Sequence, residues 1–150
     1  MGRSRLRRDL PLSEIMKKVL FVCIENSCRS QMAEALARLV APEFLGAASA
    51  GSHPYGQIDP LAVEAMGEFG YDLSTHRSKS LSEIPAGKYD YVITMGCGDE
   101  CPFIPAEFHE DWNIPDPKGK PLPAFRETRD LIAGRVKELA QRVRVLDAES

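Results

Sequence analysis

One short segment of this sequence combines a cysteine and an arginine at a spacing that can hold an anion. Cys23 is followed by five residues, then by Arg29 and Ser30. Five intervening residues let the chain curl around a tetrahedral anion, so that several backbone N–H groups point inward. Arg29 adds a planar guanidinium that can bind two anion oxygens at once. The segment therefore predicts an oxyanion-binding loop with a thiol at one end.

The same loop can make Cys23 a nucleophile. Nearby cations and the positive end of a following helix favour the thiolate form of a cysteine, and Ser30 can donate a hydrogen bond to it. Asn26 tolerates the left-handed backbone that a tight anion cradle often requires. The competing interpretation is that Cys23 ends a core strand as a small apolar residue. We expect the substrate-binding segment to comprise Ile24, Glu25, Asn26, Ser27, Cys28, Arg29 and Ser30.

A second pair of cysteines, Cys97 and Cys101, lies much further along the chain. Gly96 and Gly98 flank Cys97 and give the backbone the freedom that thiol exchange requires. Residues 1–15 lack the apolar centre of a secretory signal, so catalysis, redox exchange or metal binding is favoured over structural disulfides. A zinc site formed by all the cysteines fits the spacing only loosely, and a pair of ordinary loop thiols is the other alternative.

Asp116 is the candidate proton donor. It precedes Pro117 in a loop that follows the last expected strand. An oxygen leaving group needs a proton, and a carboxylic acid near a bound anion can supply one. In isolation, however, an Asp-Pro pair is an ordinary turn.

Alternating strands and helices must position these residues. Apolar runs predict strands at 19–23, 45–51 and 89–95, and an edge strand at 108–114. Helical periodicity and capping signals predict helices at 30–41, 61–70 and 125–146. The alternation indicates a doubly wound α/β sheet with right-handed crossovers. The Cys23 loop then lies at the carboxyl edge of the sheet, where ligands bind in such folds.

Composition narrows the classes of function. The chain has 150 residues, 43% hydrophobic and 27% charged, as in a single globular domain. Its net charge of −3 gives no general attraction to nucleic acid, and no apolar run is long enough to span a membrane. We expect residues 1–15 to be a disordered basic extension, with Met16 as an alternative start, and residues 16–150 to form the domain. A cytoplasmic monomer without metal or cofactor is the expectation.

The segment Cys-Ile-Glu-Asn-Ser-Cys-Arg-Ser, continued by Gln-Met-Ala-Glu, resembles the Cys-x5-Arg-Ser loop of low-molecular-weight tyrosine phosphatases and of the related arsenate reductases. The resemblance covers residues 17–145. It implies a single α/β domain with a four-stranded parallel sheet flanked by helices. It also implies that Asp116 is the general acid.

Two residues depart from the family pattern. Glu25 stands where better-known relatives carry a small residue, and a carboxylate there repels an anionic substrate unless it points outward. Tyrosine phosphatases of this type continue with tyrosines after Asp-Pro, whereas this chain continues with Lys118, Gly119 and Lys120. The second departure argues against recognition of phosphotyrosine.

The resemblance implies reduction of arsenate to arsenite by a cysteine relay. Cys23 attacks arsenic and Asp116 protonates the leaving oxygen; Cys97 then attacks Cys23, and Cys101 attacks Cys97. The resulting Cys97–Cys101 disulfide supplies the two electrons, and an external thiol reduces it. Thioredoxin is the first expectation for that donor, and a glutaredoxin or low-molecular-weight thiol is the second. The alternatives are a tyrosine phosphatase acting through a Cys23 phosphocysteine and a non-enzymatic redox-sensing module.

Some arsenate reductases of this family hold a potassium ion behind the loop. Asn26, Glu34 and Ser49 match three of the ligand positions, and Lys79 stands where those members have an aspartate. We hypothesise that the Lys79 ammonium replaces the ion beside Glu34. His76 is interpreted as a partly buried loop histidine.

Overall fold

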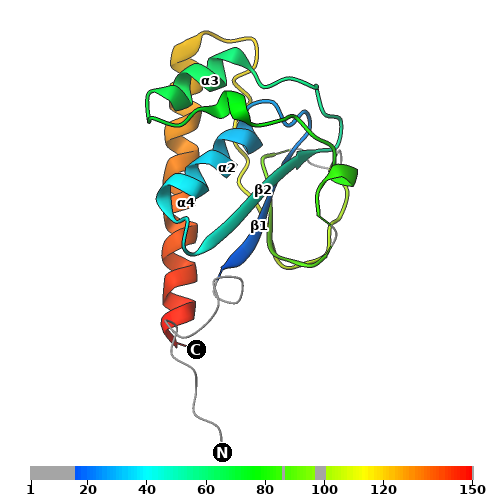
Figure 1. Ribbon diagram of the computed structural model, residues 1–150, viewed down its shortest axis with the longest axis vertical. Helices are drawn as coiled ribbons and strands as arrows, with labels where there is room; N and C mark the ends of the chain where they lie inside the picture. The colour runs from blue at the N-terminus through cyan, green and yellow to red at the C-terminus, as the bar shows by residue number, and fades with distance from the viewer. Residues whose placement is uncertain (1–15, 86, 97–100, 150) are drawn as a thin grey trace, which may run out of the picture.

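A four-stranded parallel sheet forms the centre of the molecule (Figure 1). The computed structural model describes residues 16–85, 87–96 and 101–149, with the backbone alone for 145–149. The strands are β1 (Lys17–Cys23), β2 (Leu45–Gly51), β3 (Tyr89–Thr94) and β4 (Ala106–Asp111), in the order β2-β1-β3-β4. All the pairings are parallel, which confirms the predicted fold class. The expected extension over residues 1–15 lies outside the described residues.

The burial of the strands explains how well the sequence predicted them. β1 is central, and its residues from Val19 to Cys23 are buried, so the strand reads as a continuous apolar run. β4 lies at the edge and is largely exposed. The strand predicted at 108–114 was placed too late in the chain: β4 begins at Ala106 and ends at Asp111. Trp112 and Ile114, which extended the apolar pattern, are core residues beyond the strand.

Three helices accompany the sheet in the described part of the chain, and two short 3-10 turns connect α3 to β3. The helices are α2 (Arg29–Val40), α3 (Pro60–Gly67) and α4 (Leu122–Glu149), and the turns are η2 (Leu73–Thr75) and η3 (Leu81–Glu83). Asp59 caps α3 by accepting a hydrogen bond from Leu61 N at 2.9 Å. α3 nevertheless ends at Gly67 and not at residue 70, because a turn closed by Gly70 N and Gly67 O follows it.

The core lies mainly between the sheet and the helices. Buried residues of α2, α3 and α4 pack with Val19 and Phe21 of β1 in one large cluster, and Figure 1 shows the three helices on the same side of β1 and β2. A smaller cluster on the opposite face includes Leu20 and Val22. No helix within the described ranges has both the length and the apolar character that crossing a membrane requires.

Because the strands are parallel, their carboxyl ends meet at one edge of the sheet. The segments that follow β1, β3 and β4 therefore converge there. Arg29, at the start of α2, joins all three, since its guanidinium donates hydrogen bonds to the carbonyl oxygens of Met95 and Ile114. This edge holds Cys23, Arg29 and Asp116, three of the residues that the sequence marked as chemically active.

Candidate active site

The loop between β1 and α2 curls around the thiol of Cys23. Asn26 N donates a hydrogen bond to Cys23 Sγ at 3.2 Å, and Ser30 Oγ lies 2.8 Å from the same sulfur. Asn26 has φ of 51°, so the predicted left-handed backbone at this position is confirmed. No side chain caps the first turn of α2, whose N–H groups begin at this loop. These N–H groups and the positive end of the helix favour an anion beside the thiol.

Gly51 allows the loop to pack against β2. A Cβ atom at this position would lie 2.6 Å from Ile24 O and 3.0 Å from Asn26 N, which is too close for any other residue. The sequence marked Gly51 only as the end of a strand. Its role as a support of the loop follows from the parallel pairing of Cys23 with Gly51.

Arg29 is buried, and the Nε atom of its guanidinium has no hydrogen-bond partner. Its NH1 group donates to Met95 O at 2.6 Å and to Ile114 O at 2.9 Å, while NH2 lies 3.7 Å from Asp116 Oδ2. Within the described residues, Arg29 Nε is the one buried side-chain nitrogen or oxygen that has no hydrogen-bond partner. Leaving such a donor unpaired costs about 1–3 kcal/mol, and more for a charged group. The Nε–H group is therefore suited to bind an anion oxygen.

A cavity of about 70 Å³ opens between the loop and Asp116. Its lining consists of Cys23, Ile24, Glu25, Ser27, Cys28, Arg29 and Asp116. The side chain of Asp116 is 47% exposed and accepts hydrogen bonds from the Cys28 thiol, at 3.6 Å, and from Lys118 N, at 3.1 Å. The structure thus brings the predicted nucleophile, anion-binding arginine and proton donor to one cavity.

Cys28 differs from Cys23 in its surroundings, although both are free thiols. Burial raises the pKa of the Cys28 thiol far above its ordinary value, and the nearby charges of Asp116 and Cys23 raise it further. Cys28 therefore keeps its proton at neutral pH and can donate it to Asp116.

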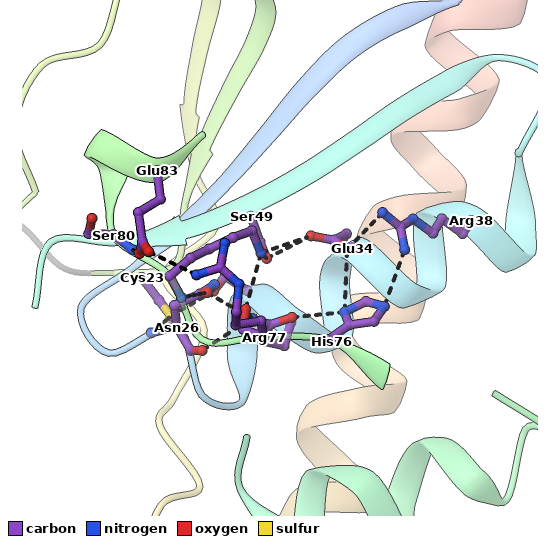
Figure 2. A network of polar contacts seen from close by, with 12 residues as sticks. Cys23, Asn26, Glu34, Arg38, Ser49, His76, Arg77, Ser80 and Glu83 are labelled. Carbon is purple, nitrogen blue, oxygen red and sulfur yellow. Dashed lines mark hydrogen bonds and ion pairs between the residues drawn. The ribbon is translucent and has the colours of Figure 1, made fainter. Parts of the chain in front are cut away.

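A polar network behind the loop connects the thiol to α2 and to the segment after η2 (Figure 2). Asn26 Nδ2 donates to Ser30 Oγ at 2.8 Å, and Asn26 Oδ1 accepts from Gln31 Nε2 at 2.7 Å. Gln31 Oε1 in turn lies 2.8 Å from His76 Nδ1. Sequence reasoning missed Gln31. The sequence carries no signal for this role, because Gln31 follows two other polar residues, Arg29 and Ser30, at the start of α2.

Glu34 anchors the far end of this network. Ser49 Oγ donates to Glu34 Oε1 at 2.8 Å, and Lys79 Nζ lies 3.7 Å from the same oxygen and 3.4 Å from Ser49 Oγ. Arg38 and His76 contact the other carboxylate oxygen, at 3.0 and 3.3 Å. Burial lowers the pKa of Lys79, while the charge of Glu34 opposes that shift. The structure therefore places an ammonium group beside Glu34.

The second cysteine pair is described only in part. Cys101 is disulfide-bonded, whereas Cys97 lies outside the described residues. Cys101 and Ile104 pack against the smaller core cluster, on the face of the sheet opposite the large cluster. The structure thus describes one of the two predicted relay thiols.

The parallel sheet and the Cys-x5-Arg loop at its carboxyl edge define a class of protein. The family model of the low molecular weight phosphotyrosine protein phosphatase matches residues 18–148, and the chain belongs to this family. The match covers the whole described domain, from β1 to α4, as the resemblance of the loop implied.

Within this family, the chain is similar to proteins named arsenate reductases. A glutaredoxin arsenate reductase of Synechocystis sp. is 38% identical over 131 residues, which are 85% of this chain and 99% of that protein. Arsenate reductase 1 of Staphylococcus haemolyticus is 37% identical over 128 residues, or 83% of this chain and 96% of its own. A solved structure described as an arsenate reductase in the phosphate binding state has a TM-score of 0.77 and 38% identity, covering 85% of this chain and 99% of that one.

Proposed function

We propose that this protein reduces arsenate to arsenite, with Cys23 as the nucleophile. The observation that carries the proposal is that Arg29, whose buried Nε–H has no hydrogen-bond partner, lines the same cavity as Cys23. A tetrahedral oxyanion supplies the acceptor that this donor lacks and brings its central atom near the sulfur. The relatives named arsenate reductases support arsenate as that anion.

The first step joins arsenic to the protein. The Cys23 thiolate attacks arsenic, an S–As bond forms, and one As–O bond breaks. Asp116 gives a proton to the departing oxygen, which leaves as water. Arg29 and the backbone N–H groups of the loop bind the remaining oxygens and stabilise their charge.

Arsenic is reduced in the second step. The Cys97 thiolate attacks Cys23 Sγ, so an S–S bond forms, the S–As bond breaks and its electron pair stays on arsenic, which leaves as arsenite. Cys101 then attacks Cys97 and releases Cys23 as a thiolate. Two thiols have been oxidised to a disulfide and arsenic has gained two electrons. A disulfide-bonded Cys101 together with a free Cys23 is the pattern expected at the end of this sequence of steps.

An external thiol donor must reduce the Cys97–Cys101 disulfide before the next turnover. We propose thioredoxin or a glutaredoxin as this donor, in the cytoplasm; the name of the Synechocystis relative favours the second. A low-molecular-weight thiol is the remaining candidate. Comparing the three donors at equal arsenate concentration identifies the physiological class.

The proposal is tested by coupling arsenate reduction to NADPH oxidation with each donor system. We expect arsenate-dependent loss of NADPH in the wild type and none in Cys97→Ser. The same Cys97→Ser protein should still hydrolyse p-nitrophenyl phosphate, because that reaction needs only the loop and the acid. Cys23→Ser should lose both reactions. NADPH oxidation by Cys97→Ser at the wild-type rate would rule out the relay.

A second candidate function is hydrolysis of phosphate monoesters. This function is favoured because Cys23, Arg29 and Asp116 line one cavity. These groups suffice to form a phosphocysteine intermediate, which water then hydrolyses. Turnover of p-nitrophenyl phosphate without arsenate-dependent NADPH oxidation would make this the primary activity. Absence of both would favour the redox-sensing module.

A further inference from the structure

The two residues that depart from the family pattern contact each other. Glu25 Oε2, in the anion loop, forms an ion pair with Lys118 Nζ, two residues beyond Asp116. Each side chain is 37% exposed, which places the pair at the surface. Since Glu25 and Asp116 both line the cavity, the pair connects two of the segments that form its wall.

A third segment takes part through Tyr55. The Lys118 ammonium lies 4.1 Å from the centre of the Tyr55 ring, at a distance typical of a cation–π contact. Tyr55 N donates to Glu25 O at 2.9 Å, so the ring is tied to the anion loop by its own backbone. Lys118 N also donates to Asp116 Oδ1 at 3.1 Å, which ties the lysine to the acid.

We propose that Glu25, Lys118 and Tyr55 form a clasp at the rim of the cavity, and that this clasp selects unesterified oxyanions over aryl phosphate esters. The inference rests on the proposed function, because it concerns the substrate class of the same site. Lys118 and Tyr55 are positioning and selecting groups here, and they take no part in the bond-breaking steps.

The size of the cavity supports this selection. A volume of about 70 Å³ is roughly half of the ~150 Å³ cavity that accommodates benzene. An oxyanion of five heavy atoms can therefore bind inside with the clasp closed. The ring of an aryl ester has to lie outside, at the rim, where it competes with the Glu25–Lys118 pair and with the Tyr55 contact.

Charge supports it as well. A lone Glu25 carboxylate would repel every anion that approaches the loop. Its hydrogen bond to Lys118 raises the pKa of the lysine, so Lys118 stays charged and offsets Glu25 at neutral pH. In the closed clasp, the Lys118 ammonium thus offsets the repulsion between the Glu25 carboxylate and an anion. It does so without an unpaired positive charge over the loop. Opening it for an aryl group would separate the two charges and expose both to the ligand.

The test compares two ligands that need no turnover, inorganic phosphate and benzylphosphonate, by isothermal titration calorimetry. The central variant is the double substitution Glu25→Gln with Lys118→Gln, which opens the clasp while leaving the net charge of the rim unchanged. The matched control is Glu68→Gln with Arg126→Gln, an ion pair of similar exposure that joins the residue after α3 to α4 and does not line the cavity. Single variants at Glu25 and Lys118 report the charge effect alone.

We expect the double variant to bind benzylphosphonate about tenfold more tightly relative to phosphate than the wild type does, since an exposed ion pair and a cation–π contact no longer have to be broken. Phosphate affinity should change less than twofold. Lys118→Gln alone should weaken phosphate binding, and Glu25→Gln alone should strengthen it, with both effects smaller at high salt. The control pair should leave the ratio unchanged.

Equal changes in affinity for both ligands in the double variant would contradict the proposed role of the clasp. The proposed function would not be affected, since phosphate would still occupy the loop. A wild type that already binds benzylphosphonate as tightly as phosphate would contradict the proposed role of the clasp as well. If the wild type did not bind phosphate at all, this result would instead contradict the anion site itself, and with it the proposed function. The outcomes therefore separate the two hypotheses.

Discussion

Ser30 Oγ lies 2.8 Å from Cys23 Sγ and also accepts a hydrogen bond from Asn26 Nδ2 at 2.8 Å. Because the amide nitrogen of Asn26 can only donate, it occupies a lone pair of the hydroxyl oxygen. The hydroxyl hydrogen is then free to point at the sulfur. Asn26 thus sets the direction of the hydrogen bond that Ser30 gives to the thiolate.

This arrangement predicts the effect of Ser30→Ala. A hydrogen bond to a charged group contributes about 1.5–3 kcal/mol, so its loss should slow the attack of Cys23 by at least about tenfold. Alkylation of Cys23 by iodoacetamide at neutral pH and hydrolysis of p-nitrophenyl phosphate should both show the loss. Ser82→Ala, a change at an exposed serine of η3, serves as the control. Unchanged alkylation in Ser30→Ala would contradict the inferred direction of the hydrogen bond.

Asp116→Asn should separate chemistry from binding. The amide cannot supply the proton of a general acid, so kcat should fall about 10²–10⁴-fold. Phosphate should bind at least as tightly as before, because one negative charge beside the anion has been removed. The measurements are kcat for p-nitrophenyl phosphate and the Kd of phosphate, with Asp130→Asn on α4 as the control. A Kd that rises as much as kcat falls would assign Asp116 to binding and not to proton transfer.

Local spacing explains why part of this site could be predicted from the sequence. Cys23, Arg29 and Ser30 lie within one loop, and a strand before it and a helix after it fix its place at the edge of the sheet. Asp116 is distant in the chain, and its role was predicted from the family resemblance alone.

The contacts that sequence reasoning could not give depend on how distant segments meet. Glu25 and Lys118 are 93 positions apart, and nothing in either segment indicates that their side chains point toward each other. Gln31 was missed because its hydrogen bonds reach both the loop and Arg77 O, so its function appears only once the segment after η2 is in place. The ends of α3 and β4 were displaced for a similar reason, since turns and core packing overrode the apolar pattern.

Gly51→Ala should distort the anion loop, because Gly51 at the end of β2 packs directly against it. The added Cβ would meet Ile24 O at 2.6 Å and Asn26 N at 3.0 Å, and backbone atoms cannot yield as a flexible side chain does. We expect a loss of roughly 1–3 kcal/mol in the free energy of unfolding, together with weaker phosphate binding. Urea denaturation and calorimetry measure the two effects.

Gly134→Ala is the matched control, because a Cβ at this position in α4 meets no atom within 4 Å. Alanine in a helix interior should stabilise the protein by about 0.5–1 kcal/mol. Equal stability changes at the two glycines would show that Gly51 does not support the loop by close approach.

His76 should make the protein sensitive to mild acid. Burial lowers the pKa of His76 below its ordinary 6.5, the Glu34 carboxylate opposes this shift, and the charges of Arg38 and Lys79 add to it. The unfolded state therefore takes up the proton first as the pH falls, and stability is lost from about pH 6.5 downward. One proton gives a slope of at most about 1.4 kcal/mol per pH unit.

The measurement is urea denaturation between pH 7.5 and pH 5. We expect His76→Gln to be less stable than the wild type at pH 7.5 but to lose less stability on acidification. His53→Gln, at an exposed histidine just after β2, should follow the wild-type curve. Parallel curves for His76→Gln and the wild type would assign the acid sensitivity to other groups.

Lys79 should make the network behind the loop independent of potassium. Its ammonium lies 3.7 Å from Glu34 Oε1 and 3.4 Å from Ser49 Oγ, so a positive charge is already present among these oxygens. We expect potassium chloride and choline chloride at equal concentration to give the wild type the same Tm. Lys79→Asp removes the ammonium and adds a carboxylate, which creates a set of oxygen ligands without a cation.

Lys79→Asp should therefore have a lower Tm in choline chloride and recover part of it in potassium chloride, because a cation that binds only the folded state stabilises it. Lys88→Asp, with the same change of charge at an exposed site, should show no such difference between the salts. A wild-type Tm or turnover that rises markedly with potassium would show that the ammonium does not replace the ion.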